Sequence, residues 1–524
     1  MKITIKRGFQ PPVCFESSKT APLASQVLKD AGFLIDLPCA GRGICKKCRI
    51  QAVGILSEPT PEEKNAFLPS ELKAGARLAC QTRLLGDAAL SLEDTGESVI
   101  LCDGHLPPFT VNPMGDGLGI AVDIGTTTLA LYLAELSTGK ILARTSRKNP
   151  QSVFGGDVIS RIEKAMSGEG AALRNAVITA IDEMILEACR LAKTKASRIT
   201  AGVLAGNTAM LYLLCGENPA SLAAAPFQAG DLFGKTLSAK ELGLTAIGNT
   251  AAVYLPRCIG AYLGADITAA LVSSQLEKES GAAILLDLGT NGEMILKTDT
   301  GLYGCSTAAG PAFEGVGLYQ GMQALPGAVD SVWWQGGRLA YTFIGDIAPK
   351  GICGSGMISL TAAFLESGII DGTGRIQTDH PYAAAHLKTV DGLPAVEIES
   401  SGVLVTQKDI RSIQLAKAAV CAGILTLLNE AALDPSQLSA VLLAGGFGNY
   451  INVCCGEKMG LFPEGLAAIT RPTGNSSGMG AFLLLEDKSF LADSERLAES
   501  VQEIDLSSNA FFQEAYVDCM LFDE

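Results

Sequence analysis

The chain has 524 residues and a hydrophobic share of 48%, which is more apolar material than one core normally holds, so we expect several folded domains and little disorder. The formal net charge of −15 argues against nucleic acid and against an anionic membrane as partners, because both bind basic surfaces. The 15 cysteines, in a sequence in which we recognise no signal peptide, indicate a reducing, cytoplasmic compartment where thiols bind metal or are buried.

Three stretches of the chain differ in their pattern. Residues 1–94 alternate polar and apolar positions around a cysteine-rich loop, which predicts a small sheet domain with one helix. Residues 95–117 are rich in turn-forming dipeptides and predict a linker. From residue 118 onward, short apolar strands alternate with helical runs, and we expect an α/β body with a first part at 118–205 and a main part at 206–524. No apolar run reaches the roughly 20 residues that cross a bilayer, so we expect no membrane span.

Four cysteines near the N-terminus have the spacing of an iron–sulfur ligand set. Three share a loop of the form C-x5-C-x2-C and one follows further on: Cys39, Cys45, Cys48 and Cys80. One [2Fe-2S] cluster binds four thiolates, and such a loop with a distant fourth cysteine is its signature. The glycines at 41 and 43 permit the tight turns that aim backbone N–H groups at a cluster. A structural zinc site is the alternative, but zinc normally takes two C-x2-C pairs and the second is missing here.

This loop resembles that of the adrenodoxin-like ferredoxins. The resemblance implies that residues 1–94 form a ferredoxin-like β-grasp domain.

Two segments of the body, 119–132 and 283–296, resemble each other: each reads as a strand ending in Asp-aliphatic-Gly-Thr, a turn and a second strand. The carboxylates at the strand ends, Asp123 and Asp287, suit Mg²⁺ or the orientation of a water molecule. The turns offer N–H and hydroxyl donors to phosphate oxygens. These donors are Gly125, Thr126, Thr127 and Thr128 in the first turn, and Gly289, Thr290 and Asn291 in the second. A third element, a buried strand opening into Gly445, Gly446 and Phe447, leaves room for a flat adenosine against the backbone.

In this order the three elements resemble the two phosphate motifs and the adenosine motif of the superfamily of acetate and sugar kinases, heat-shock chaperones and actin. The segments 351–357 and 475–480 resemble its connecting helices. The resemblance implies a duplicated, ribonuclease H-like α/β body that holds ATP with Mg²⁺ between its halves.

Over its whole length, the chain resembles the ATP-dependent reductive activators of corrinoid proteins. The resemblance implies an ATP-hydrolysing enzyme that passes a low-potential electron through the cluster to Co(II) of a corrinoid and so regenerates Co(I). The corrinoid would belong to a partner protein, either the corrinoid subunit of a methyltransferase or a corrinoid iron–sulfur protein. A reduced ferredoxin or flavodoxin would be the electron donor, and a homodimer is compatible with the family.

A metabolite kinase of the same superfamily, with an accessory iron–sulfur domain, is the main alternative. In that case an Asp near the cleft would activate a substrate hydroxyl, although nothing in the sequence names a substrate. An assembly protein of the actin type would leave the cluster without a task. A ferredoxin-bearing hydroxylase would need a second cysteine quartet, which is missing.

Overall fold

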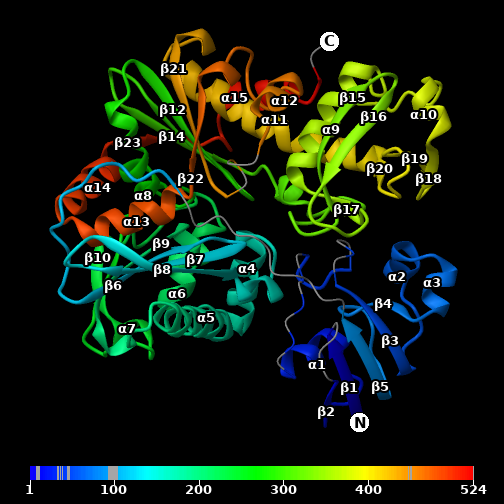
Figure 1. The fold of residues 1–524 in the computed structure, drawn as a ribbon, viewed down its shortest axis with the longest axis horizontal. Helices are drawn as coiled ribbons and strands as arrows, with labels where there is room; N and C mark the ends of the chain where they lie inside the picture. Colours follow the sequence, from blue (N-terminus) through cyan, green and yellow to red (C-terminus); the bar gives the residue numbers. More distant parts are fainter. Residues whose placement is uncertain are drawn as a thin grey trace. The chain divides into compact units, whose positions relative to one another are not determined.

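The structure is a computed structural model that describes residues 1–7, 12–31, 33, 35, 37, 39–43, 46, 48–92, 104–446, 448 and 451–522 (Figure 1). It divides into two units, and each is described by itself. The N-terminal unit comprises Met1–Glu97 and Pro150–Lys164, and the main unit comprises Ser98–Asn149 and Ala165–Glu524.

The N-terminal unit contains a five-stranded sheet in the order β2-β1-β5-β3-β4. Its strands are β1 (Lys2–Arg7), β2 (Val13–Glu16), β3 (Arg49–Leu56), β4 (Ala76–Leu78) and β5 (Leu84–Leu92). β1 and β5 run parallel while the other neighbours run antiparallel, which is the β-grasp arrangement expected from the ferredoxin resemblance. Ile3 and Ile5 alternate along β1 and are fully buried in one core with Val27 and Leu28 of α1 (Ala24–Asp30).

Two further helices of this unit, α2 (Pro61–Ala66) and α3 (Pro69–Lys73), are short and were not predicted from the sequence. Each begins with a proline, which fixes φ and lacks the N–H that a first helical turn leaves unused. The prolines at positions 61 and 69 therefore mark helix starts.

Residues 150–164 also belong to the N-terminal unit, although they follow a strand of the main unit in the chain. They form the 3₁₀ helix η1 (Pro150–Val153) and α4 (Val158–Lys164). The Leu37 N–H donates to the Ser152 carbonyl at 3.3 Å, and the Lys29 ammonium lies 3.9 Å from the centre of the Phe154 ring. This segment thus packs close to the start of the cysteine loop.

The first sheet of the main unit has six strands in the order β10-β11-β9-β6-β7-β8. They are β6 (Leu118–Ile124), β7 (Thr128–Glu135), β8 (Lys140–Lys148), β9 (Ile199–Gly206), β10 (Lys235–Ser238) and β11 (Ala252–Leu255). Their helices are α5 (Gly170–Leu191), α6 (Thr208–Cys215) and α7 (Ala239–Leu242). β6, β7 and β8 form an antiparallel meander, and β9 joins β6 in parallel.

The second sheet repeats this plan in the order β22-β21-β12-β13-β14-β23. Its strands are β12 (Ala282–Leu288), β13 (Gly292–Lys297), β14 (Leu302–Thr307), β21 (Leu438–Ala444), β22 (Thr470–Gly474) and β23 (Val501–Glu503). β12, β13 and β14 form the antiparallel meander, and β21 joins β12 in parallel as β9 joins β6. The internal duplication read from the sequence is therefore present in the strand order.

Helices cover both sheets, and two smaller three-stranded sheets complete the unit (Figure 1). The helices are α8 (Ala265–Ser274), α9 (Gly354–Ser367), α10 (Pro381–Ala385), α11 (Gln407–Glu430), α12 (Val453–Lys458), α13 (Ser476–Glu486), α14 (Ser489–Ser500) and α15 (Ala510–Asp518). The small sheets are formed by β15 (Ala328–Gln335), β16 (Arg338–Phe343) and β17 (Gly351–Ile352), and by β18 (Leu387–Val390), β19 (Leu393–Glu397) and β20 (Leu404–Thr406). The segments 351–357 and 475–480, which were predicted to be connecting helices, contain the first residues of α9 and α13.

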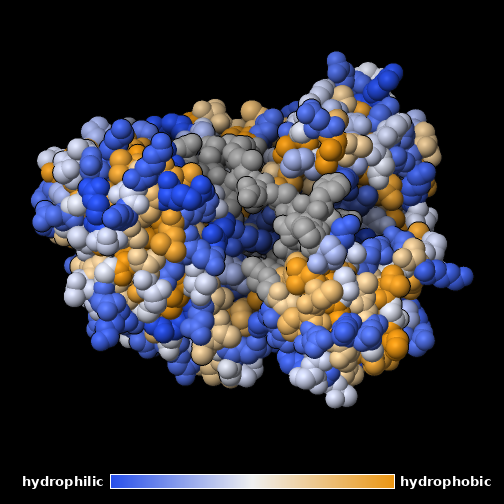
Figure 2. All heavy atoms as spheres, turned by 60° about the horizontal axis from the view of Figure 1, so that its bottom comes forward, coloured by the Kyte–Doolittle hydropathy of each residue, from blue (hydrophilic) through white to orange (hydrophobic). Residues whose placement is uncertain are grey.

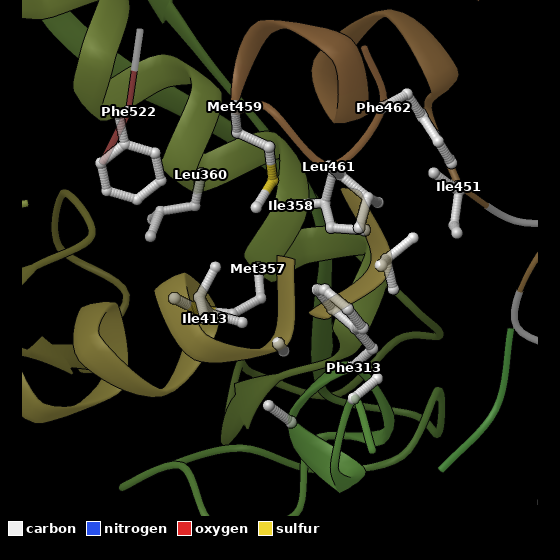
Figure 3. Packing of buried hydrophobic residues seen from close by; sticks show 14 of the residues in the cluster. Phe313, Met357, Ile358, Leu360, Ile413, Ile451, Met459, Leu461, Phe462 and Phe522 are labelled. Carbon is white, nitrogen blue, oxygen red and sulfur yellow. The ribbon is translucent and has the colours of Figure 1, made fainter. Parts of the chain in front are cut away.

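The core of the C-terminal part gathers side chains from distant elements (Figure 3). Phe313, Met357 and Phe462 are each at most 2% exposed within it. α11 contributes Ile413 to this core. By length and composition alone α11 could cross a membrane, but 78% of its most apolar window is buried inside the protein, as in a core helix. Figure 2 shows apolar side chains scattered among hydrophilic ones on one face of the molecule.

Part of the segment expected to be a linker lies on the main unit. Residues 104–114, here called the strap, run beside β22 and α13: the His105 N–H donates to the Thr473 carbonyl at 2.9 Å and the Met114 N–H to the Leu485 carbonyl at 3.0 Å. Phe109 packs edge-on against Phe482, with ring centres 5.9 Å apart. The remaining part of the predicted linker, through residue 103, lies outside the described residues.

Candidate functional site

Three thiols of the predicted cluster site lie close together in the N-terminal unit. Cys39, Cys48 and Cys80 are at most 5% exposed, and the Sγ atoms of Cys48 and Cys80 are 3.3 Å apart. Cys48 directly precedes β3 and Cys80 follows β4, and the antiparallel pairing of Arg49 with Leu78 brings both to one end of the strand pair. Cys45 falls outside the described residues.

The loop around these thiols is fastened by Gln81. Its side-chain amide donates to the Gly41 carbonyl at 2.9 Å and to the Cys80 Sγ at 3.5 Å. Gly43 has a φ of 77°, and a Cβ there would stand 2.9 Å from the Gln81 amide nitrogen, so a glycine is required. Hydrogen bonding from Cys48 lowers the pKa of Cys80, while burial opposes this shift. Thiolate sulfur is the donor that iron–sulfur clusters and structural zinc sites both take.

Among the described residues, no group of three or more His, Cys, Asp or Glu side chains lies close enough together to hold a metal ion. The fourth predicted ligand, Cys45, lies outside that set. The three described thiols are buried sulfur donors, and this donor set fits a cluster bound by thiolates.

A buried ion pair supports the segment that carries Cys80. Glu63 of α2 and Arg77 of β4 are 0% and 4% exposed and form two hydrogen bonds of 2.9 Å each. Glu63 also accepts from the Leu78 N–H at 3.0 Å and from the Thr82 hydroxyl at 2.8 Å. The position of Cys80 between Leu78 and Thr82 is therefore fixed from α2.

In the main unit, the two phosphate hairpins are the β6–β7 and β12–β13 turns. A Cβ on Gly125 would stand 2.7 Å from the Thr128 carbonyl oxygen, so the first turn admits only glycine there. Asn149 holds this turn, because its N–H donates to the Thr127 carbonyl and its side-chain amide to the Gly125 carbonyl, each at 2.8 Å. In the second turn the Gly289 N–H donates to the Asn291 carbonyl at 2.9 Å.

The two hairpins share one carboxylate. The hydroxyl of Thr127 donates to Glu314 Oε2 at 2.7 Å, and the hydroxyl of Thr290 donates to Glu314 Oε1 at 2.6 Å. The structure thus brings the predicted threonines of both turns to a single point, and places there an acid that the sequence analysis did not single out.

Four carboxyl groups interact near the hairpins: the half-buried Asp123 and Asp287, which were predicted, together with half-buried Asp266 of α8 and buried Glu293 of β13. Burial raises the pKa of Asp287 to about 7, with the charge of Asp123 adding to the shift. Burial, with the charges of Asp287 and Asp123, likewise raises the pKa of Asp266 to about 7. The pKa of Asp123 is also raised by burial, against a 2.9 Å hydrogen bond from the Ser477 hydroxyl.

The carboxyl groups of this cluster raise one another's pKa values. Glu293 faces Asp287 across the β12–β13 pair, and its pKa is raised well above its usual value by burial and by Asp266 and Asp287. A divalent cation with oxygen ligands would relieve the repulsion, so the donor set fits Mg²⁺.

The predicted adenosine element lies beside the second hairpin. Gly445 follows β21 with a φ of 90°, and a Cβ there would stand 2.6 Å from the Asp287 Oδ1. Gly446 follows it in a turn, and Phe447 lies outside the described residues. Asp287 and the glycine turn are therefore packed against each other.

Sequence reasoning missed Glu314, Asp266 and Glu293. Asp266 stands in the first turn of α8, and a Cβ on the preceding Gly264 would meet its Oδ1 at 2.7 Å. Glu293 lies within the second repeated segment, but the sequence does not show that it is the strand partner of Asp287. That pairing is set by the register of β12 and β13. No local pattern marks Glu314.

Two family models match the main unit of this chain. Residues 281–524 match the family described as the C-terminal domain of RACo, the ASKHA domain, and residues 118–279 match the RACo middle region. The corrinoid activation enzyme RamQ of Eubacterium limosum is 33% identical over 420 residues, which cover 78% of this chain and 70% of that protein. The chain belongs to the RACo family.

Two further proteins resemble the chain over most of its length. The [Co(II) methylated amine-specific corrinoid protein] reductase of Methanosarcina barkeri is 27% identical, covering 73% of this chain and 72% of that protein. The solved structure of a reductive activator for corrinoid, iron–sulfur protein superposes with a TM-score of 0.71 at 27% identity, covering 99% and 98% of the two chains. The predicted family, the enzyme class and the multidomain α/β fold with an actin- and sugar kinase-like C-terminal domain are confirmed.

The N-terminal part has relatives of another kind. A component of the Na(+)-translocating NADH-quinone reductase of Chlamydia muridarum is 37% identical over 79 residues, which cover 15% of this chain and 18% of that protein.

Proposed function

We propose that this chain uses ATP to drive the reduction of Co(II) to Co(I) in a corrinoid bound to a partner protein. The observation that carries the proposal is the similarity to RamQ over most of the chain, because that relative is a corrinoid activation enzyme. The presence of a cysteine loop followed by two predicted phosphate hairpins in one chain supports the proposal. The comparisons support an iron–sulfur cluster and ATP as classes of cofactor, and we assign the cluster as [2Fe-2S].

In this proposal Cys39, Cys45, Cys48 and Cys80 hold the cluster, which supplies a one-electron carrier. The rigid pairing of β3 with β4 and the Gln81 contacts to Gly41 and Cys80 keep the described thiols in register. Burial of these thiols excludes water from them and favours delivery of the electron to a docked partner.

In the main unit, Thr127 and Thr290 donate to phosphate oxygens, aided by the backbone of 125–128 and 289–291. Asp123 and Asp287 hold Mg²⁺ or orient the attacking water, and Gly445, Gly446 and Phe447 contact adenosine. Water attacks the terminal phosphorus, the bond to the bridging oxygen breaks, and inorganic phosphate and ADP leave. For a one-electron step about 59 mV changes an equilibrium constant tenfold, and ATP can supply such a bias only by favouring one state of the complex.

We further propose a reduced ferredoxin or flavodoxin as the donor, a cytoplasmic location and a homodimer as an assembly to test. The partner is either a methyltransferase corrinoid subunit or a corrinoid iron–sulfur protein.

The test mixes the reduced protein, ATP and a Co(II) corrinoid protein without oxygen, and follows the cobalt absorption. We expect Co(I) to form only when ATP is present, and the purified protein to contain about two iron and two sulfide per chain. Stoichiometric zinc would contradict the cluster. A phosphorylated metabolite formed with no response to any corrinoid protein would favour the kinase alternative.

A further inference from the structure

Glu314 joins the two phosphate hairpins at the point where a phosphate group is expected. Its carboxylate accepts one short hydrogen bond from each hairpin, from Thr127 at 2.7 Å and from Thr290 at 2.6 Å. Thr127 lies in the turn between β6 and β7, and Thr290 lies in the turn between β12 and β13. These two strand pairs belong to different sheets of the main unit. One anionic group therefore ties together both halves of the duplicated body.

The position of Glu314 is fixed by its neighbours in the chain. It ends the 3₁₀ helix η6 (Pro311–Glu314), and the preceding Phe313 is 2% exposed in the hydrophobic core (Figure 3). The following Gly315 has a φ of 72°, and a Cβ there would stand 2.3 Å from the Met322 carbonyl oxygen. The carboxylate is thus held against the hairpins by a packed segment and is not a loose surface group.

A carboxylate and a phosphate compete for the same donors. Both are anions that accept charge-assisted hydrogen bonds from hydroxyl and N–H groups, and two such anions close together repel each other. A nucleotide whose phosphate binds Thr127 and Thr290 must therefore replace Glu314. The displaced segment leads through Gly321, which bridges to Ile352 beside the start of α9.

We propose that Glu314 is a positioning residue that latches the two phosphate hairpins together in the nucleotide-free protein and is displaced by a phosphate of ATP. This inference rests on the proposed ATP site and adds a residue that sets the affinity for nucleotide. Without nucleotide, Glu314 accepts the hydrogen bonds of the Thr127 and Thr290 hydroxyls. When a phosphate takes these bonds, Glu314 is released, and the segment that carries Phe313 is released with it.

The test measures Mg-ATP binding by calorimetry in the full-length wild type and in Glu314→Gln and Glu314→Ala variants. Glu366→Gln is the matched control, because Glu366 lies on α9, away from the hairpins, in an exposed ion pair with Lys458. Removal of the competing charge is expected to tighten Mg-ATP binding about tenfold or more in both Glu314 variants and to leave the control unchanged. The Gln variant keeps the side-chain volume and one acceptor, so it covers the case in which the Ala variant does not fold.

Amide hydrogen exchange supplies a readout that a purely structural role would not give. Without nucleotide, residues 125–127 and 289–291 are expected to exchange faster in the Glu314 variants than in the wild type, and with Mg-ATP the difference is expected to vanish. Unchanged or weaker Mg-ATP binding in both variants, with binding by the wild type, would overturn the latch alone. Absence of Mg-ATP binding by the wild type would overturn the proposed function and the latch with it.

Discussion

Half-buried Asp287 and fully buried Glu486 both have a pKa raised to about 7, but their surroundings differ. Asp287 lies among other carboxyl groups beside Gly445, where a cation can balance its charge. Glu486, at the end of α13, is 0% exposed, and neither of its carboxyl oxygens has a hydrogen-bond partner among the described residues. The surroundings of Asp287 are typical of a functional site, whereas the buried Glu486 carboxyl without a hydrogen-bond partner lowers the stability of the fold.

Replacement of Asp287 by Ala is expected to lower ATP hydrolysis by roughly 10²–10⁴-fold, because the carboxylate that organises Mg²⁺ or water would be lost. A malachite green phosphate assay measures this, and the iron content checks that the N-terminal unit is intact. Asp299→Ala, which alters an exposed residue between β13 and β14, serves as the control. Undiminished hydrolysis in the Asp287 variant would place the nucleotide site elsewhere.

Replacement of Glu486 by Gln is expected to stabilise the main unit at alkaline pH. The folded-state pKa of Glu486 lies above its usual value, so its protonated form is favoured in the fold, and stability is lost as the pH rises from about 4.5 through about 7. Relative to the wild type, the variant should gain about 2 kcal/mol more at pH 8 than at pH 5.

Thermal unfolding at both pH values measures this gain, with exposed Glu514→Gln as the control. Equal pH slopes in wild type and Glu486→Gln would show that the acid is solvated or paired.

The residues that could be predicted from the sequence belong to local patterns. Asp123, Thr127, Asp287 and Thr290 stand in a strand-turn-strand unit that occurs twice, so the pattern predicted the duplicated fold and marked these residues as candidate ligands. Glu314 could not be found this way, because its function depends on two hairpins that meet only in the folded protein. The roles of these residues stay predictions until they are tested.

At the scale of single elements, α2 and β4 show how a short helix supports the cysteine site. Burial would raise the pKa of Glu63, but the Arg77 side chain and hydrogen bonds from the Thr60 and Leu78 backbone and the Thr82 hydroxyl hold it below its usual value. The sequence did not reveal this pair, since a polar stretch with two prolines is typical of a loop. The proline positions at the helix starts were the signal that could have been used.

Replacement of Glu63 by Ala is expected to destabilise the N-terminal unit by about 3–5 kcal/mol, because it leaves the Arg77 guanidinium buried and unpaired. Since the folded-state pKa of Glu63 is lowered, its contribution is present above its unfolded pKa near 4.5 and is lost as the pH falls through the folded pKa. The loss of cluster absorbance on heating measures the effect between pH 4 and pH 7. Exposed Glu58→Ala should behave like the wild type, and an equally mild effect of Glu63→Ala would contradict the buried pair.

The segment expected to be a linker shows that composition alone does not distinguish a free connection from an extended segment packed on the protein. Turn-forming dipeptides predicted a free connection over 95–117, whereas residues 104–114 lie as the strap along β22 and α13. Prolines and glycines also permit an extended segment to follow another element, and the contact of Phe109 with Phe482 is a tertiary feature. The boundary predicted at residue 205, between the first and the main part of the body, falls within β9. The two family matches meet near residue 280 instead. The domain limits therefore stay predictions.

At the scale of the whole molecule, the proposed function requires cluster and ATPase to act together but to be separable in an experiment. A Cys48→Ser, Cys80→Ser double variant of the full chain is expected to keep ATP binding and to lose cobalt reduction, because only the thiol site is removed. Calorimetry and the cobalt absorption measure the two activities. Cys14→Ser is the control, since Cys14 is exposed, and cobalt reduction by the double variant at the wild-type rate would disprove electron transfer through this site.

The discontinuous N-terminal unit has a topological consequence. Because Pro150–Lys164 belongs to the same unit as Met1–Glu97, the chain passes between the two units three times, after residues 97, 149 and 164. The N-terminal unit is therefore complete only when these two stretches, far apart in the sequence, meet. Residues 1–92 and 104–524, produced as two separate chains, are therefore expected to elute together in size-exclusion chromatography, because the packing around Phe154 and the Leu37 hydrogen bond to Ser152 join them.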